Sequence, residues 1–159
     1  MPDEIERKFL VDLDRVPLPS AGIEIRQGYL PLSERTKTVV RVRTKGDAAY
    51  LTLKGENRGA TRQEFEYAIP VLEALEILED LCHKPLIEKT RYEISADNHL
   101  WEIDIFHGEN KGLVVAEIEL KDESDHFERP GWLLEEVTGD PRYYNSNLLQ
   151  TPYKDWGAA

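Results

Sequence analysis

The sequence predicts a mainly β fold of the α+β class: a closed eight-stranded antiparallel β-barrel with a charged, tunnel-like interior and a few helices packed outside. Three observations predict it. Most of the 159-residue chain alternates polar and apolar residues with a period of two, the pattern of β-strands. Short turn-forming segments separate the alternating runs, and one face of most runs is charged. Eight strands suffice to close a barrel, and closure removes exposed strand edges.

Eight alternating runs are the predicted strands. They cover residues 3–11, 22–31, 37–45, 49–55, 61–70, 86–96, 99–107 and 112–121. Most connections between them are short and contain turn formers such as Gly46-Asp47, Asp97-Asn98 and Gly108-Glu109-Asn110. Because short connections favour antiparallel neighbours, we expect a meander in which successive strands pair.

Two regions depart from the alternation. Residues 71–81 carry a leucine at every third position, which predicts a short amphipathic helix. The C-terminal stretch 124–150 is expected to hold a helical turn near 124–128 and a last helix around 142–149, limited by Pro130 and Pro141. No linker, low-complexity tract or solenoid-like repeat interrupts the chain, so we expect a single domain over residues 1–159.

Charge is concentrated on one face of the predicted strands. Side chains two apart share a face, so Glu4, Glu6 and Lys8 project together, opposite Ile5 and Phe9. The same reasoning sorts other strands into acidic and basic faces. Their charged positions are Arg41, Arg43, Lys54, Arg62, Glu64, Glu66, Lys89, Arg91, Glu102, Asp104, Glu117 and Glu119. A solvated sheet face explains one such strand, but it explains seven less well, because like charges about 7 Å apart repel.

Counter-ions of two kinds fit these faces. The carboxylate pairs Glu4/Glu6 and Glu117/Glu119 suit a hard divalent cation, Mg²⁺ or Mn²⁺, which prefers oxygen ligands. The cations suit a multiply charged oxyanion, because arginine can fork onto phosphate oxygens and lysine acts as a point charge. The predicted phosphate ligands are Lys8, Arg41, Arg43, Lys54, Arg62, Lys89 and Arg91. A metal bridging carboxylates to phosphates would complete the set.

Composition excludes several classes of function. A net charge of −11 argues against a broad nucleic-acid surface, and no apolar run approaches the ~20 residues that span a membrane. The N-terminus lacks the basic and apolar regions of a signal peptide. Cys82 is the single cysteine, so a reducing cytoplasm is expected, with Cys82 as a small buried hydrophobe.

Familiar catalytic motifs are absent from the sequence. There is no Gly-x-x-x-x-Gly-Lys phosphate loop, no Gly-x-Gly-x-x-Gly dinucleotide fingerprint, no His-Glu-x-x-His zinc spacing and no Gly-x-Ser-x-Gly elbow.

The segment Glu4-Ile5-Glu6-Arg7-Lys8 resembles the Glu-x-Glu-x-Lys signature of the CYTH superfamily, also called triphosphate tunnel metalloenzymes. Further segments follow the family's order up to about residue 121, and the C-terminal residues 135–138 and 143–145 are also similar. These segments are Arg41-Val42-Arg43, Thr52-Leu53-Lys54-Gly55, Arg62-Gln63-Glu64-Phe65-Glu66-Tyr67, Glu88-Lys89-Thr90-Arg91-Tyr92, Glu102-Ile103-Asp104 and Glu117-Ile118-Glu119. The resemblance implies an eight-stranded tunnel and an enzyme acting on triphosphate groups, most similar to the short bacterial inorganic triphosphatases.

Carried over by position, the resemblance implies roles for the charged residues. Glu4, Glu6, Glu117 and Glu119 would bind metal, and the seven cations would bind the triphosphate. Glu4 and Glu6 would act in catalysis through a metal that orients an attacking water, and Lys8 or Lys54 would assist the leaving phosphate. The resemblance leaves two roles open for Glu64, Glu66 and Asp104. They would either hold the waters of a second metal or orient the basic residues.

Other functions remain open at this point. A class IV adenylate cyclase needs a base pocket, to which a residue such as Tyr29 could contribute. A thiamine triphosphatase could stack its substrate on Trp132 or Trp156. A non-catalytic binder of polyphosphate or organic triphosphates has no need for four carboxylates facing its anion. We expect a small anionic triphosphate as partner, no nucleic-acid or membrane partner, and a homodimer as one possible assembly.

Overall fold

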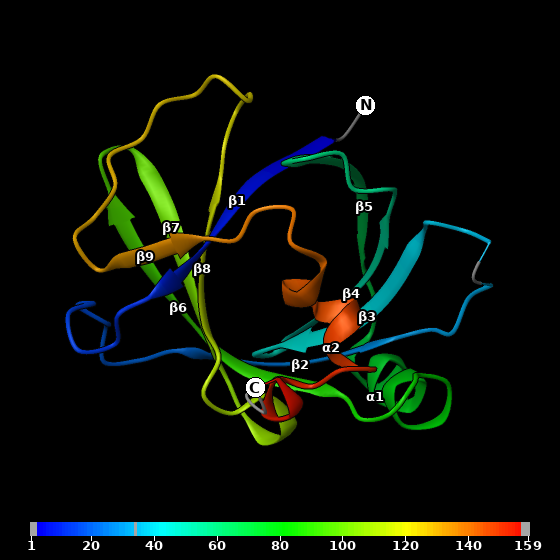
Figure 1. Ribbon diagram of the computed structural model, residues 1–159. Helices are drawn as coiled ribbons and strands as arrows, with labels where there is room; N and C mark the ends of the chain where they lie inside the picture. Colours follow the sequence, from blue (N-terminus) through cyan, green and yellow to red (C-terminus); the bar gives the residue numbers. More distant parts are fainter. Residues whose placement is uncertain (1–2, 34, 157–159) are drawn as a thin grey trace.

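The computed structural model describes residues 3–33 and 35–156, in which nine strands form one sheet (Figure 1). The strands are β1 (Asp3–Val11), β2 (Ile23–Tyr29), β3 (Val39–Lys45), β4 (Ala48–Lys54), β5 (Thr61–Ala68), β6 (Ile87–Ala96), β7 (His99–Phe106), β8 (Val114–Glu119) and β9 (Leu133–Glu136). The α-helices in this part of the chain are α1 (Val71–Asp80) and the single turn α2 (Asn145–Leu148). Short 3₁₀ turns lie at Gly108–Asn110, Pro141–Tyr143 and Tyr153–Asp155.

Eight of the strands close into the predicted antiparallel barrel. Their order is β5-β4-β3-β2-β6-β7-β8-β1, and β1 also pairs with β5, which closes the ring. The closing register runs from Asp3 opposite Gln63 to Ile5 opposite Thr61. The ninth strand, β9, lies outside the ring and pairs with the end of β1. The strand β1 therefore has three partners: β5, β8 and β9.

The predicted meander is wrong at two places. Strand β2 pairs with β3 and β6, so it does not lie beside β1, and β6 does not lie beside β5. Alternation specifies which face of a strand is buried, but it does not specify the neighbouring strand. Both connections are long, residues 12–22 before β2 and 69–86 after β5, and the second contains α1.

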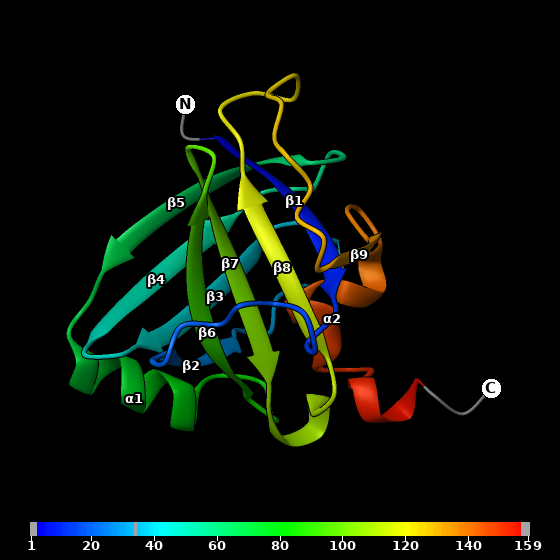
Figure 2. The same ribbon diagram turned by 90° about the vertical axis from the view of Figure 1, so that its left-hand side faces the viewer.

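Helix α1 packs against the outside of the barrel, on β3 and β4 (Figure 2). Its extent confirms the helix predicted over 71–81, but of the leucine repeat only Leu78 is buried. Ala74 and Leu78 are buried against Val42 of β3, whereas Leu72 is 76% exposed. Cys82 is buried in the same cluster, as expected of a small hydrophobe, and burial raises the pKa of its thiol.

The C-terminal region differs most from the prediction. Residues 125–130 are not helical, so the helical turn expected near 124–128 is wrong, and β9 was not predicted. The expected last helix is divided into the 3₁₀ turn Pro141–Tyr143 and the single turn α2. Figure 1, viewed down the barrel, shows the part of this region around α2 crossing one mouth of the barrel, whereas β9 lies against the outside.

The apolar core has parts on both faces of the sheet. Ile87, Phe106 and Val115 stand opposite inward-facing residues and pack with Leu148 of the C-terminal region, so one end of the barrel interior is apolar.

The other clusters lie on the outer faces of the strands. Phe9, Trp101, Ile118 and Trp132 form one cluster, in which the segment around Trp132 covers β1, β7 and β8. Trp101 and Trp132 are in edge-to-face contact, with ring centroids 5.5 Å apart, and this contact holds the segment around Trp132 against the strands. With apolar side chains packed outward, the opposite faces of the same strands are left to line the interior. Neither helix in the described part of the chain has the length and apolar character that a bilayer crossing requires.

Candidate functional site

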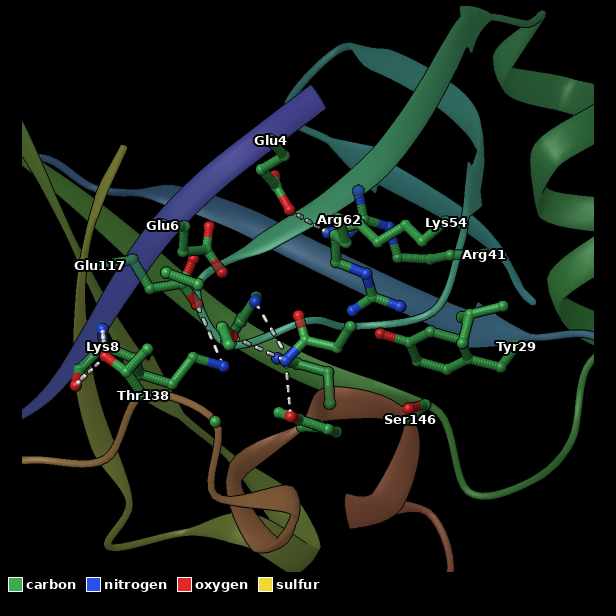
Figure 3. Close-up of a pocket in the computed structure, with 18 of the residues that line it drawn as sticks. Glu4, Glu6, Lys8, Tyr29, Arg41, Lys54, Arg62, Glu117, Thr138 and Ser146 are labelled. Atoms are coloured by element: carbon green, nitrogen blue, oxygen red, sulfur yellow. Dashed lines mark hydrogen bonds and ion pairs between the residues drawn. The ribbon is translucent and has the colours of Figure 1, made fainter. Parts of the chain in front are cut away.

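A pocket with about 740 Å³ of empty space, part of it open to solvent, lies inside the barrel (Figure 3). Nine of the charged residues singled out from the sequence line it: Glu4, Glu6, Lys8, Arg41, Lys54, Arg62, Lys89, Arg91 and Glu117. The strand alternation explains this convergence, because residues at every second position project to one side and closure of the sheet turns that side inward. Six cations and three carboxylates line the cavity, so it is basic although the chain carries a net charge of −11.

An acidic corner of the pocket is built by β1 and β8. In the antiparallel register Glu6 stands opposite Glu119, and Lys8 stands opposite Glu117. Burial and the nearby carboxylates of Glu117 and Glu4 raise the pKa of Glu6 well above its usual value. The pKa of Glu117 falls to about 2, because the positive charge of Lys8, with those of Arg91 and Lys89, outweighs its burial. Glu6 has no ion-pair partner among the described residues, so this corner carries uncompensated negative charge.

Glu119 differs from the other three predicted metal ligands. It is exposed and does not line the pocket, although it lies on the same face of β8 as Glu117. Burial and the charge of Glu4 raise its pKa, which places Glu119 at the rim of the acidic corner. In the residues that the structure describes, no three acidic, histidine or cysteine side chains are grouped closely enough to hold a metal ion.

Lysines are paired with two of these carboxylates. Lys54 Nζ lies 3.2 Å from Glu4 Oε1 and 3.2 Å from Glu64 Oε2, and Lys8 Nζ lies 3.6 Å from Glu117 Oε1. Glu64 therefore orients a lysine. Lys8 Nζ also donates to the carbonyl of Tyr143 at 3.2 Å, so the C-terminal region contributes to the position of this lysine.

Asp104 is buried behind the pocket and holds two of the cations. Its carboxylate accepts from Arg91 at 2.7 and 2.9 Å, and it lies 2.8 Å from Lys89 Nζ. Despite burial, the charges of Lys89 and Arg91 hold the pKa of Asp104 well below its usual value. Burial lowers the pKa of Lys89 to about 8, although the negative charge of Asp104 acts to raise it. Of the two roles considered for Asp104, the geometry matches orientation of the basic residues.

Two arginines on β3 share one carboxylate. Arg41 and Arg43 lie 3.5 and 3.4 Å from the same oxygen of Glu66, which also accepts from Thr52 Oγ1 at 3.0 Å. The Nε atoms of both arginines are buried without a hydrogen-bond partner in the described structure. Burial and the charge of Arg41 lower the pKa of Arg43. Positive charge on this side of the barrel is therefore incompletely neutralised.

Arg62 enters the pocket from β5, at the closing seam of the barrel. It stands opposite Glu4 in the register, but its guanidinium donates to the carbonyl of Gly55 at 3.2 and 3.0 Å. None of the described carboxylates forms an ion pair with it. Figure 3 shows the Arg62 guanidinium reaching into the middle of the cavity, between Tyr29 and the acidic corner.

The mouth segment (residues 138–146) supplies lining residues that the sequence did not identify. Thr138, Gly139, Tyr144, Asn145 and Ser146 all border the pocket. Tyr144 is joined to the β4–β5 loop on the far side of the mouth by a 2.7 Å hydrogen bond from Asn57 Nδ2 to its hydroxyl. The one sequence signal for this segment was its similarity to the C-terminal region of the CYTH superfamily, because neutral residues in an irregular segment have no periodic pattern.

Comparisons with known proteins agree with this architecture. The CYTH domain family matches residues 2–145. An inorganic triphosphatase of Acetivibrio thermocellus is 53% identical over 156 residues, covering 98% of this chain and 99% of that protein. An inorganic triphosphatase of Nitrosomonas europaea is 39% identical over 154 residues, covering 91% of this chain and 95% of the relative.

Solved structures show the same fold. A crystal structure of an inorganic triphosphatase is 35% identical, covers 94% of this chain and 95% of its own, and superposes with a TM-score of 0.65. A putative adenylate cyclase from Bacillus halodurans, 20% identical over 77% of this chain and 84% of its own, has a TM-score of 0.60 and shows likeness of fold alone. By its sequence, its closed barrel and its relatives, the chain belongs to the CYTH domain family.

Proposed function

We propose that this protein hydrolyses inorganic triphosphate to pyrophosphate and orthophosphate in a reaction that depends on a divalent metal ion. The observation that carries the proposal is the pocket itself: six cations and three carboxylates converge inside the barrel of an otherwise acidic chain. Such a lining suits a multiply charged anion together with a cation that bridges it to the carboxylates. Two relatives with nearly complete coverage are inorganic triphosphatases.

The acidic corner is the proposed metal site. Glu4, Glu6 and Glu117 offer oxygen ligands alone, which Mg²⁺ and Mn²⁺ prefer, and Glu119 adds a carboxylate at the rim. A tight group of three carboxylates is not needed, because one or two carboxylates, waters and substrate phosphates commonly complete the shell of Mg²⁺. The raised pKa of Glu6 supports the fit, because a bound cation would offset both the burial and the repulsion from Glu117 and Glu4 that cause it. When bound, the metal would supply neutralisation of phosphate charge and a lowered pKa for water. The choice between Mg²⁺ and Mn²⁺ stays open, because these ligands suit both.

The basic residues bind and orient the triphosphate. Arg41 and Arg62 line the pocket, are incompletely neutralised and would take non-bridging phosphate oxygens, since a guanidinium forks onto two oxygens at once. Arg43, also predicted as a phosphate ligand, is buried and does not line the pocket. Lys89 and Arg91, fixed by Asp104, would add a rigid positive wall. Lys8 and Lys54 stand between the acidic corner and the cavity, where they would stabilise charge on the leaving phosphate. Water then attacks a terminal phosphorus in line with the bridging oxygen that leaves.

A phosphate-release assay tests the proposal. Purified protein is given tripolyphosphate, ATP or thiamine triphosphate, each with Mg²⁺, Mn²⁺ or EDTA. We expect orthophosphate from tripolyphosphate with a much higher kcat/KM than from ATP, and no release in EDTA. Formation of cyclic AMP would instead identify a cyclase, faster turnover of thiamine triphosphate a thiamine triphosphatase, and binding without turnover a polyphosphate-binding protein.

Three further predictions from the sequence accompany this proposal. The chain acts as one domain over residues 1–159, its partner is a small triphosphate and not a nucleic acid or a membrane, and it acts in the cytoplasm. The homodimer stays a prediction, which light scattering of the purified protein would test.

A further inference from the structure

One wall of the pocket is neutral, in contrast to the charged walls around it. On β2, Gln27 and Tyr29 stand opposite Arg43 and Arg41, so these two side chains project to the same inner face as the arginines. Gln27 is fully buried and Tyr29 is 8% exposed. Asn145 of the mouth segment meets this wall from the opposite direction, and both Tyr29 and Asn145 line the pocket.

Hydrogen bonds fix the amide of Asn145. Its Oδ1 accepts from Lys89 Nζ at 3.3 Å and from Gln27 Nε2 at 3.3 Å. Gln27 Nε2 also donates to the hydroxyl oxygen of Tyr29 at 2.9 Å. Both N–H groups of Gln27 are thereby used, and its own Oε1 is buried with no partner in the described structure. An unsatisfied buried carbonyl costs folding free energy, so the orientation of Gln27 that holds Asn145 and Tyr29 in place lowers the stability of the protein.

The orientation of the Asn145 amide follows from its neighbours. A lysine ammonium has donors and no acceptor, so the atom of Asn145 that faces Lys89 has to be the oxygen. The NH₂ group therefore points away from Lys89. Neither this NH₂ group nor the Tyr29 hydroxyl hydrogen has an acceptor among the described residues. Figure 3 shows the Tyr29 hydroxyl directed toward the interior of the pocket.

We propose that Asn145 binds the substrate directly, donating from its NH₂ group, together with the Tyr29 hydroxyl, to oxygens of the phosphate that lies nearest Lys89. This inference rests on the proposed function and adds two neutral ligands to its charged ones. A fully ionised phosphate has acceptors and no donors, so it suits the free N–H and O–H donors that Asn145 and Tyr29 present to the cavity. Neutral donors orient this phosphate without adding charge that would slow its release.

The variant Asn145→Asp separates this role from mere positioning of Lys89. The aspartate keeps the oxygen that accepts from Lys89 and Gln27, but it replaces the NH₂ donor with a second acceptor. We expect a 10- to 100-fold rise in the Kd for tripolyphosphate, measured by calorimetry in EDTA, and a similar rise in KM with Mg²⁺. The matched control is Gln150→Glu, which makes the same amide-to-carboxylate change at an exposed position nearby and should bind like the unaltered protein.

A Kd for Asn145→Asp within threefold of the unaltered protein would overturn the inference, because it would show that the oxygen alone matters. Should Asn145→Asp lower the melting temperature, Asn145→Ala and Tyr29→Phe, each measured as folded protein, decide the question: a Kd raised about 10-fold supports direct donation and an unchanged Kd contradicts it. Because binding is measured apart from turnover, loss of this inference is distinguishable from failure of the proposed hydrolysis, which the unaltered protein alone tests.

Discussion

Asp104 and Arg91 form a two-point ion pair, with Oδ1 2.7 Å from Nε and Oδ2 2.9 Å from Nη2, between the facing strands β6 and β7. Asp104 is 1% exposed, and the same carboxylate also neutralises Lys89. One buried carboxylate thus contacts two buried cations, Glu102 adds a second partner to Arg91 at 3.1 Å, and these ion pairs hold a rigid basic wall beside the cavity.

Removal of this carboxylate should destabilise the protein strongly. Asp104→Ala leaves Lys89 and Arg91 buried without their main counter-charge, and breaking a buried ion pair costs about 3–5 kcal/mol. Urea denaturation measures the unfolding free energy. Glu88→Ala is the control, because Glu88 pairs with Arg26 at 3.4 Å on the exposed surface and should contribute less than about 1 kcal/mol. Equal losses in the two variants would contradict the role of Asp104.

Arg41 should be required for turnover, whereas an arginine of the neighbouring strand should not. Arg41→Ala removes an incompletely neutralised guanidinium from the cavity and should lower kcat/KM for tripolyphosphate by about 10²–10³. Arg26→Ala removes the same charge from the outer, half-exposed face of β2 and should leave kcat/KM unchanged. Both values come from phosphate-release kinetics with Mg²⁺, and a threefold or smaller effect at Arg41 would refute its assignment.

Glu6→Gln should inactivate the enzyme while stabilising the protein in EDTA. The pKa of Glu6 is raised above its unfolded value of 4.5, so its contribution to stability is present below pH 4.5 and is lost as the pH rises through the folded pKa. The variant should therefore unfold at a higher temperature than the unaltered protein at pH 7, and the difference should vanish below pH 4.5. Mg²⁺ should raise the melting temperature of the unaltered protein but not of Glu6→Gln. Metal-dependent activity in Glu6→Gln would contradict the assignment of Glu6 as a metal ligand.

Acid sensitivity should depend on Glu136 of β9. Glu136 accepts two hydrogen bonds from Arg7, at 2.8 and 2.6 Å, and these, with Thr138, lower its pKa to about 2 despite partial burial. Because the folded pKa is depressed, this contribution is present above pH 4.5 and is lost as the pH falls toward 2. Because solvent screens this partly exposed pair, the contribution is about 1 kcal/mol. Glu136→Gln should remove that part of the pH dependence, seen in unfolding curves from pH 5 to 2; parallel curves for both proteins would contradict it.

The strands of the barrel could be predicted because the alternation of polar and apolar residues that specifies them lies within short stretches of sequence. A period of two sets the face of each residue, so runs such as Glu4-Ile5-Glu6-Arg7-Lys8 specify both the strand and the inward direction of its charges. Strand order was less predictable, because the same faces are compatible with more than one set of neighbours. Glu119 shares its face with Glu117, yet it emerges at the rim, since position along the barrel axis depends on register and not on alternation.

The C-terminal region was missed because distant residues determine its path. Strand β9 has four residues, and its attachment depends on Arg7, 129 positions earlier, through Glu136. The orientation of the Asn145 amide depends on its hydrogen bonds with Lys89 of β6 and Gln27 of β2. A neutral amide in an irregular stretch carries no periodic signal that would identify it as part of a site.

The arrangement around Lys8 has a consequence for biosynthesis. Its backbone N–H donates to Thr138 Oγ1 at 2.9 Å, and its carbonyl accepts from Val137 N at 2.8 Å, so β1 is completed by a segment that is synthesised 130 residues later. Contacts between such distant residues form late, because a long loop has to close first. The nascent polypeptide therefore acquires its full cavity only after residues 137–146 have left the ribosome, and fragments ending before β9 lack part of it.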